Sequence, residues 1–416
     1  MNFSFIHVAD IHLGRPFSGL SKFSCDENAS KIYKKAVEKS LNNVVEFAIN
    51  RNVDFVFIAG DTFDSTESDF SSKLILKNAL KKLSDSSISV FLIAGNHDPI
   101  TAYNKNTFNF NENSKIKIIG LNTPISAKLP LYSKNDGLVG YLHALSFSEE
   151  KFTSNPLEHF TQADEKLFNI GLLHCDLNAD LNSPYAPCTS TALNLLGYDY
   201  WALGHIHIPT SDDGNIQYSG TLQGRNTKET GEHGIRFVKV ENDKIVKNTF
   251  IPLDVVRYLD LDIDLSSATD EVDAGNLIDE EINLIVNKEQ NLCDMYLINI
   301  KLSGCVSFYS KIDDSFFETI SENITANSIK KVYISQFQNN LSPQVDEELI
   351  KNDEGIAGEL YKLISNEDTI QNTYDEVISQ LKNVKINVND INSIVNDVKE
   401  IGMNLCNLIY NDTKED

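Results

Sequence analysis

The stretch Val90-Phe91-Leu92-Ile93-Ala94-Gly95-Asn96-His97-Asp98 joins a short apolar run to a polar tail. Apolar runs of this length are typical of strands that are buried on both faces. Four more such runs end in a polar motif: Phe5–Ala9 before Asp10 and His12, Phe55–Ala59 before Asp61, Ile170–Leu173 before His174, and Tyr200–Leu203 before His205 and His207. Ligands collect beyond the carboxyl ends of such strands. The five runs therefore predict that these aspartate, asparagine and histidine side chains meet at one rim of one sheet.

The side chains expected at this rim are typical of a divalent metal site. No cysteine is among them, which argues against a thiolate zinc site, and mixed carboxylate, amide and imidazole ligands suit manganese, iron or zinc. Seven ligands predict two ions, and two ions about 3.5–4 Å apart can clamp both oxygens of a phosphoryl displacement. We expect Asp61 to bridge them. The remaining ligands divide into two sets: Asp10, His12 and His207 for one ion, and Asn96, His174 and His205 for the other. His97 is left beside the ions, where a general acid would lie.

Each motif also has a structural explanation. Asp-x-His is common, and Gly-Asp after a strand is often only a turn. The set of five in order nevertheless favours a metal site. The four other histidines are expected to be structural, with His7 in the core and His143, His159 and His233 at the surface. For His143 we also consider a role in orienting the metal ligands through a hydrogen bond from behind them.

In their order, the motifs resemble those of the calcineurin-like metallophosphoesterases. Within that superfamily the chain is similar to the SbcD type of DNA repair nuclease, and to its YhaO branch. The narrower likeness rests on Ala9–Phe17 (ADIHLGRPF), on Gly60–Asp64 (GDTFD), and on Ser219–Arg225 (SGTLQGR) with Glu229–Gly234 (ETGEHG). The resemblance covers about the first 240 residues.

This resemblance implies an α/β fold: a four-layer αββα sandwich with a small α+β capping domain and a helical C-terminal segment. It implies a DNA phosphodiesterase with two divalent ions, manganese being expected and iron or zinc the alternatives. The expected activity is that of a 3′→5′ exonuclease in DNA repair, with single-strand endonuclease activity as a further expectation. His97 would donate a proton to the leaving oxygen or hold the phosphate, and Asp98 would set its orientation. Some family members have a histidine at the position of Asp64. The direction of strand degradation and the catalytic efficiency therefore stay open.

The pattern of helices and strands predicts three domains: 1–252 for the nuclease, 253–338 for the cap, and 339–416 for an acidic helical segment. Helices over 29–50 and 70–83 alternate with the first three strands, as in an α/β fold. Further strands are expected at 217–218, 235–240 and 245–252, to complete a second sheet. The cap is expected to contain strands over 255–265, 295–302 and 332–335, a helix near 275–288, and a linker after it at 339–343.

The C-terminal segment is expected to be helical. Its last helix carries a stripe at three- and four-residue steps, formed by Ile391, Ile394, Val395, Val398, Ile401, Leu405, Leu408 and Ile409. In SbcD-like nucleases this segment docks on the coiled-coil base of an SMC-like ATPase. The resemblance thus implies DNA and an SbcC-type or YhaN-type ATPase as partners, with a homodimer as a further expectation. A stripe of this kind suits packing on a coiled coil. The alternative is that the helices pack on the chain's own middle domain.

The net charge of −24 is unevenly distributed. Residues 251–416 hold 12 Lys+Arg and 32 Asp+Glu, whereas residues 1–250 hold 24 and 28. An acidic face repels phosphate backbones, so DNA would approach another side or a partner's basic surface. Alternatively, the acidity only keeps an exposed domain in solution.

The six cysteines form no CxxC pair and indicate thiols in a reducing cytosol. The first expected strand begins at residue 3 and no apolar run approaches the length of a membrane span, so a cytoplasmic location without membrane contact is expected. Two other functions stay open. One is a phosphoesterase for small substrates or phosphoproteins, and the other is a mainly structural subunit of a repair complex.

Overall fold

The computed structural model describes residues 1–14, 32–111, 114–164, 166–178, 182–286, 293–327, 330–344, 347–380 and 391–412. The chain forms two compact units, residues 1–259 with 289–296, and residues 260–288 with 297–416. All predicted metal ligands lie in the first unit. The predicted three-domain division stays a prediction. Arg15–Phe17 of the quoted motif and the start of the helix predicted at 29–50 lie outside the described residues.

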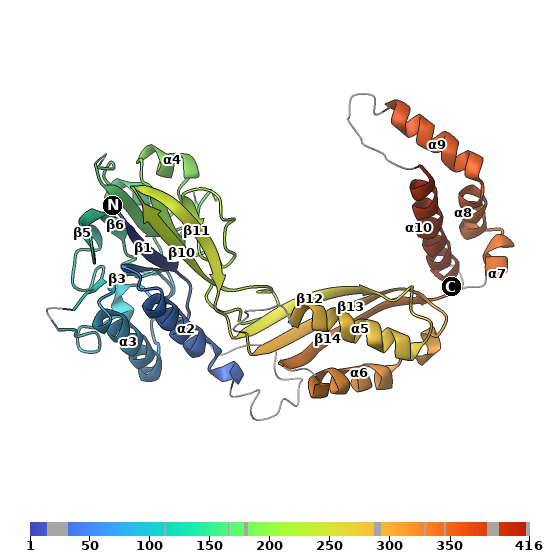
Figure 1. The fold of residues 1–416 in the computed structure, drawn as a ribbon, viewed down its shortest axis with the longest axis horizontal. Helices are drawn as coiled ribbons and strands as arrows, with labels where there is room; N and C mark the ends of the chain where they lie inside the picture. The colour runs from blue at the N-terminus through green and yellow to red at the C-terminus, as the bar shows by residue number, and fades with distance from the viewer. Residues whose placement is uncertain are drawn as a thin grey trace. The chain divides into compact units, whose positions relative to one another are not determined.

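The first unit begins with the predicted alternation of strands and helices. Its elements are β1 (Phe3–Val8), α2 (Ala36–Asn50), β2 (Phe55–Ala59), α3 (Phe70–Asp85) and β3 (Ser89–Ile93). β1, β2 and β3 pair in parallel, because each connection returns through a helix. α2 and α3 lie side by side along this sheet (Figure 1). All three strands therefore end at the same edge.

Two more strands join this sheet beside β1. β10 (Gly234–Glu241) pairs antiparallel with β1, and β11 (Lys244–Pro252) pairs with β10. With β4 (Ile116–Ile118) the strand order is β11-β10-β1-β2-β3-β4. The prediction that 235–240 and 245–252 complete the second sheet is therefore wrong. The helical crossovers leave one edge of β1 unpaired, and β10 pairs with that edge. The local sequence pattern does not specify which edge a later strand joins.

The second sheet contains β5 (Ser126–Ser133), β6 (Gly137–Leu145), β7 (Phe168–His174), β8 (Tyr200–Gly204) and β9 (Ile216–Tyr218), in that order. β7 ends in His174, and β8 leads to His205 and His207. The prediction that all five apolar runs belong to one sheet is therefore wrong. Three runs lie in one sheet and two in the other, and the polar motifs meet because the sheets are stacked.

An aromatic layer holds the two sheets together. Phe5, Phe57 and Phe91 of the first sheet share a buried cluster with Phe168 and Tyr200 of the second. The rings of Phe5 and Tyr200 lie 5.1 Å apart, edge to face, a favoured arrangement of aromatic rings. Alternate residues of β1 and β2 point the other way, into the core beneath α2 and α3.

The outer face of the second sheet is covered by the short helix α4 (Ser190–Leu195) and by loop segments. Trp201 and Leu203 of β8 pack there, and both are fully buried. The layer order is thus helices, sheet, sheet and a thin fourth layer. The predicted αββα fold class is confirmed.

The second unit contains most of a three-stranded sheet in the order β12-β13-β14, with two helices alongside it (Figure 1). Its elements are β12 (Val256–Asp264), α5 (Glu271–Val286), β13 (Met295–Val306), α6 (Asp314–Asn327) and β14 (Lys331–Pro343). Helix α6 was not predicted. The predicted linker at 339–343 is wrong, because these residues continue β14. The end of the helix predicted to residue 288 lies outside the described residues.

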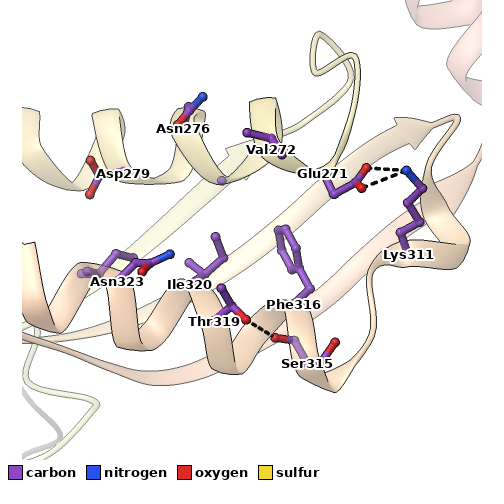
Figure 2. A pocket seen from close by; sticks show the side chains of 12 residues that line it. Glu271, Val272, Asn276, Asp279, Lys311, Ser315, Phe316, Thr319, Ile320 and Asn323 are labelled. Atoms are coloured by element: carbon purple, nitrogen blue, oxygen red, sulfur yellow. Dashed lines mark hydrogen bonds and ion pairs between the residues drawn. The ribbon is translucent and has the colours of Figure 1, made fainter.

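A groove of about 550 Å³ lies between α5 and α6 (Figure 2). Phe316 and Ile320 are among its apolar lining residues, and Glu271 and Asp279 are its two lining carboxylates. The Glu271 carboxylate is bonded to Lys311 Nζ at 2.8 and 2.9 Å. Because Glu271 is paired with Lys311, Asp279 is the one lining carboxylate that remains. The groove therefore does not resemble the predicted metal-ligand sets of the first unit, in which several ligands converge.

Four helices end the described chain: α7 (Glu347–Lys351), α8 (Ile356–Ser365), α9 (Glu367–Gln380) and α10 (Ile391–Asp412). Ile350, Ile364 and Cys406 form part of a buried cluster shared by α7, α8 and α10. A Cβ at Gly402 of α10 would lie 2.7 Å from Ile364 of α8, so these two helices are in close contact. Much of α10 thus packs on its neighbours in this unit.

The five cysteines among the described residues are free and buried. None of the described helices is both long enough and apolar enough to cross a membrane.

Candidate metal centre

Tight turns at the ends of the strands aim the predicted ligands at one place. Asp10, His12, Asp61 and His205 have positive φ angles of 51°, 50°, 48° and 106°. Such angles are uncommon outside glycine, cost about 1–3 kcal/mol each, and cluster at functional sites. Four predicted ligands thus share a strained backbone that the surrounding fold must hold in place.

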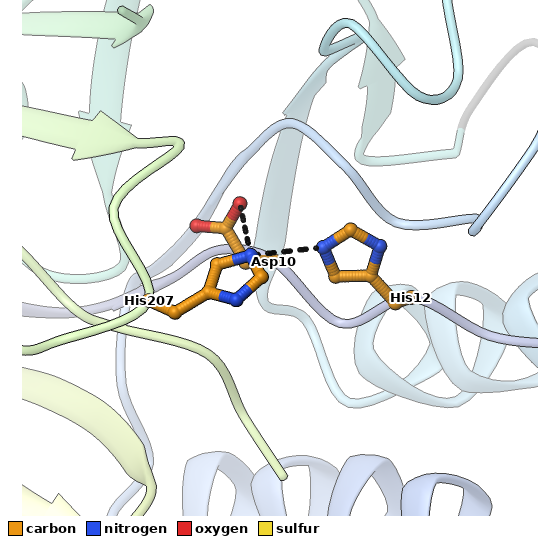
Figure 3. A group of neighbouring side chains, drawn as sticks. All are labelled: Asp10, His12 and His207. Carbon is orange, nitrogen blue, oxygen red and sulfur yellow. Dashed lines mark hydrogen bonds and ion pairs between the residues drawn. The ribbon is translucent and has the colours of Figure 1, made fainter. Parts of the chain in front are cut away.

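The first predicted ligand set is assembled at the ends of β1 and β8 (Figure 3). His12 Nε2 lies 3.3 Å from His207 Nε2, and His207 Nε2 lies 3.9 Å from Asp10 Oδ1. One ligand atom of each residue lies within 4.8 Å of the others. Two imidazole nitrogens and a carboxylate that converge in this way are suited to sharing one cation.

The second predicted set is assembled across the two sheets. Asn96 Oδ1 lies 2.9 Å from His174 Nε2 and 3.2 Å from His205 Nδ1. His174 Nδ1 donates to the Ala59 carbonyl oxygen at 2.9 Å. That bond orients the ring so that Nε2 faces the site, as in histidine ligands of metals generally.

Asp61 lies between the two sets. Its Oδ2 is 3.9 Å from His12 Nε2 and 3.4 Å from His174 Nε2. Its Oδ1 accepts the His97 backbone N–H at 2.9 Å. The side chain is almost fully buried. The structure thus brings all seven predicted ligands together with Asp61 in the bridging position, and the donor set fits two divalent ions. That these residues bind metal stays a prediction.

Two glycines make room for this arrangement. A Cβ at Gly95 would overlap Asp61 Oδ1, and a Cβ at Gly204 would overlap the Ala59 carbonyl oxygen. The Gly204 Cβ would also lie 2.8 Å from His174 Nδ1. The glycines of the motifs are therefore needed for close approach of the backbone to the ligands.

The charges of the apoprotein are arranged around Asp61. Burial lowers the pKa of His12 and of His205 to about 4, so both are neutral at pH 7. Burial raises the pKa of Asp10 to about 6. Burial opposes a charge on His174 too, but the neighbouring Asp61 carboxylate overcomes it and raises the pKa of His174 to about 9. In the apoprotein, His174 is thus protonated at pH 7 and carries a positive charge beside the Asp61 carboxylate.

The role predicted for Asp98 is wrong. Its buried carboxylate accepts the backbone N–H groups of Asp61, Thr62 and Gly95 at 3.1, 2.7 and 2.8 Å. His97 Nδ1 instead donates to the Asp64 carbonyl oxygen at 3.0 Å. Asp98 therefore holds the two ligand loops together, because a carboxylate can accept several N–H groups at once. The exposed His97 ring is oriented by the main chain.

Three residues behind the ligands were not predicted. Asp64 Oδ1 lies 3.3 Å from His12 Nδ1, whereas the sequence suggested only that Asp64 replaces a phosphate-binding histidine. Glu229 Oε1 lies 2.9 Å from His207 Nδ1 and accepts from Arg225 Nη2 at 2.9 Å. The only signal for Arg225 and Glu229 was a pair of opposite charges four residues apart in the quoted motifs.

The other histidines differ partly from expectation. His7 is fully buried, as predicted. His143 and His233 were expected at the surface and are buried. His143 lies in β6 between β5 and β7 of the second sheet, and its ring contacts Asn169 and packs against Tyr198.

Residues 3–209 match the model of the family described as calcineurin-like phosphoesterases. The first half of this chain is a calcineurin-like metallophosphoesterase domain. Over 249 residues, 58% of this chain, it is 31% identical to the uncharacterized metallophosphoesterase YhaO of Bacillus subtilis. The aligned part is 58% of that protein, so the chain spans about three fifths of the length of this relative. The likeness agrees with the predicted YhaO branch.

Solved structures similar to this metallophosphoesterase domain include a dimetal phosphatase from Danio rerio. It has 13% sequence identity and a TM-score of 0.36, with 61% of this chain and 98% of that chain covered. Another is GAP50, the anchor in the inner membrane complex of Plasmodium. It has 13% identity and a TM-score of 0.36, with 61% and 85% covered.

We expect metal binding by the metallophosphoesterase domain to release protons. Below about pH 9 the His174 imidazole of the apoprotein is protonated, and a cation must displace that proton to reach Nε2. Metal affinity should therefore rise with pH towards 9, and fall further below about pH 6, where Asp10 also takes up a proton. Calorimetric titration with Mn²⁺ at pH 7.5, in buffers of different ionisation enthalpy, counts the protons. Binding without proton release would contradict the charge assignment.

Proposed function

We propose that this metallophosphoesterase domain hydrolyses phosphodiester bonds at DNA ends, as a 3′→5′ exonuclease that uses two divalent ions. The observation that supports the proposal is the position of the Asp61 carboxylate, 3.9 Å from His12 and 3.4 Å from His174, between the two predicted ligand sets. Two divalent ions, when bound, activate water and neutralise the charge that develops on a phosphoryl group. Manganese suits this mixed oxygen and nitrogen set, and iron or zinc are alternatives.

The residues of the site divide the remaining work. Asp61 sets the spacing between the two ligand sets, and Asp98 fixes the loops that carry Asp61 and Gly95. His97 lies beside the first set, with its ring centroid 5.0 Å from that of His12. Because its Nδ1 is bonded to the main chain, its Nε2 is the nitrogen that would hold the phosphate or protonate the leaving oxygen.

Apolar side chains beside the ligands favour a nucleic acid over a small phosphoester. Tyr185 packs against His205, with ring centroids 4.9 Å apart. Ile206 and Ile208, on either side of His207, are 36% and 75% exposed. Aromatic and apolar surfaces of this kind can stack on or support unpaired bases. The likeness to SbcD-type nucleases in the quoted motifs supports the same substrate class.

The proposal is tested with purified protein and Mn²⁺ on end-labelled duplex and single-stranded DNA. The small chromogenic substrate bis-(p-nitrophenyl) phosphate serves for comparison. We expect shortening of labelled strands from the 3′ end and loss of the activity with EDTA. Hydrolysis of the small diester without any cleavage of DNA would support the phosphoesterase alternative. No hydrolysis of either substrate would support a structural role.

We further propose that the C-terminal helices dock a coiled-coil ATPase. Val398, Ile401 and Leu405 form an exposed row on α10, at spacings of three and four residues. Leu363 of α8 is also 55% exposed and lines an apolar groove with Val398. This spacing suits packing against a coiled coil, and the acidity of residues 251–416 suits a basic partner.

We expect Ile401→Glu to abolish co-purification with such an ATPase, while hydrolysis of a small phosphodiester is unchanged. The substitution leaves the buried cluster around Cys406 intact, which deletion of the helix would not. Leu195→Glu is the matched control, because Leu195 is an equally apolar residue on α4 with 74% exposure. Undiminished binding by the Ile401 variant would contradict docking through this row.

A further inference from the structure

A buried ion pair lies directly behind one predicted metal ligand. Arg225 is 2% exposed, and its Nη2 donates to Glu229 Oε1 at 2.9 Å. Its backbone N–H and its Nε donate to Glu229 Oε2 at 2.8 and 3.3 Å. These donors keep Glu229 ionised, so its carboxylate is purely an acceptor. The same Oε1 lies 2.9 Å from His207 Nδ1.

We propose that Glu229 is a positioning residue for His207. Its carboxylate accepts the Nδ1 proton of the imidazole, which places the lone pair of Nε2 towards Asp10 and His12. A neutral imidazole carries one N–H, and the partner of one nitrogen decides what the other presents. A carboxylate behind a histidine also makes that histidine a stronger ligand.

Arg225 offers the competing arrangement. Its Nη2 lies 3.2 Å from His207 Nδ1, and a proton donated along that line would put the imidazole N–H on Nε2. That tautomer would point a hydrogen at His12 and would remove the ligand lone pair. The contact to Glu229 is shorter and joins a donor to an anion, and Nη2 already donates to Glu229. The geometry therefore favours the Nδ1–H form.

The segment that carries Glu229 is fixed from behind. His233 Nε2 lies 3.1 Å from the Glu229 carbonyl oxygen, and the Gly231 N–H donates to the Tyr258 carbonyl oxygen at 2.9 Å. The carboxylate is thus held in place before any ion binds. Such preorganisation is what a positioning residue requires.

This inference rests on the proposed metal site and predicts a selective defect. Glu229→Gln keeps the shape of the side chain and removes the charge. We expect it to weaken Mn²⁺ binding at the set of Asp10, His12 and His207 by about 10–100-fold, a typical effect of losing such a partner. Binding at the second set, which contains Asn96, should change little.

The matched control is Glu232→Gln. Glu232 lies in the same segment and pairs at 3.0 Å with Arg257, which is not near a ligand. Calorimetric titration with Mn²⁺ should show two sites in the wild type and in Glu232→Gln, and one strong and one weakened site in Glu229→Gln. Two sites of unchanged affinity in Glu229→Gln would overturn the inference alone. A wild-type protein that does not bind two ions would overturn the proposed metal centre.

The tautomer of His207 can be measured in the apoprotein, so this second test does not depend on metal binding by any variant. The chain has nine histidines, so nitrogen NMR of histidine-labelled apoprotein can resolve the His207 signals, assigned with His207→Gln. We expect the proton on Nδ1 at neutral pH. A proton on Nε2 would show that Arg225 sets the tautomer, and would overturn the role of Glu229 even if the Glu229 variant failed to fold.

Discussion

Asp61→Asn should remove most hydrolytic activity and weaken both bound ions. The carboxylate lies between the two ligand sets, and its Oδ2 faces His12 and His174. An amide cannot supply two negative oxygens to two cations. We expect the loss of activity to exceed the roughly 10–100-fold typical of residues that only support a ligand. Steady-state hydrolysis and elemental analysis of the dialysed protein measure the two effects.

Asp54→Asn is the control for this experiment. Asp54 is a buried carboxylate just before β2, where it accepts the backbone N–H groups of Ser4 and Lys134 at 2.9 and 2.8 Å. Asp61 follows the other end of the same strand. The control should keep its activity and both ions. Two full metal equivalents in Asp61→Asn would rule out the bridge.

His97→Ala should separate chemistry from binding. We expect turnover to fall by about 10²–10⁴-fold, the usual cost of losing an acid–base group. Both ions and the affinity for DNA should persist, because the His97 side chain is exposed and belongs to neither predicted ligand set. Single-turnover rates, metal content and DNA binding by anisotropy give the three values.

His159→Ala controls for the loss of an imidazole. His159 is exposed, lies in a short 3-10 helix and belongs to neither predicted ligand set. It should behave as the wild type. Loss of metal from His97→Ala would make His97 a ligand and reverse the assigned roles.

The sequence alone was sufficient to predict strands where a continuous apolar run is followed directly by a polar motif. The runs ending at Ala59 and Ile93 are apolar throughout, and their strands form as predicted. The ligand sets also follow from the sequence, because Asp61, His174 and their neighbours each stand at the end of such a run. Their position beyond strand ends follows from the general rule for such strands, but their meeting between two stacked sheets does not.

The sequence was insufficient where spatial neighbours decide. β10 and β11 carry the apolar pattern of any strand, and nothing local states that they pair beside β1 rather than in the second sheet. Gly137 and Gly140 in β6 interrupt its apolar alternation, so that strand gave a weak signal. Helix α6 was overlooked although Phe316, Ile320 and Ile324 recur every four residues.

The supporting contacts of the site were beyond sequence reasoning. Glu229 is separated from His207 by β9, and only the folded chain brings the two side chains together. Asp98 was expected to orient its neighbour His97. Its carboxylate instead turns inwards to the backbone of the Asp61 loop. Adjacent residues thus serve different parts of the site.

The central claim is that Asp61 joins two metal ions, and anomalous diffraction from crystals grown with Mn²⁺ tests it most directly. We predict two anomalous peaks about 3.5–4 Å apart, one beside Asp10, His12 and His207 and the other beside Asn96, His174 and His205, with the Asp61 carboxylate between them. A single peak, or two peaks that do not share Asp61, would contradict the account.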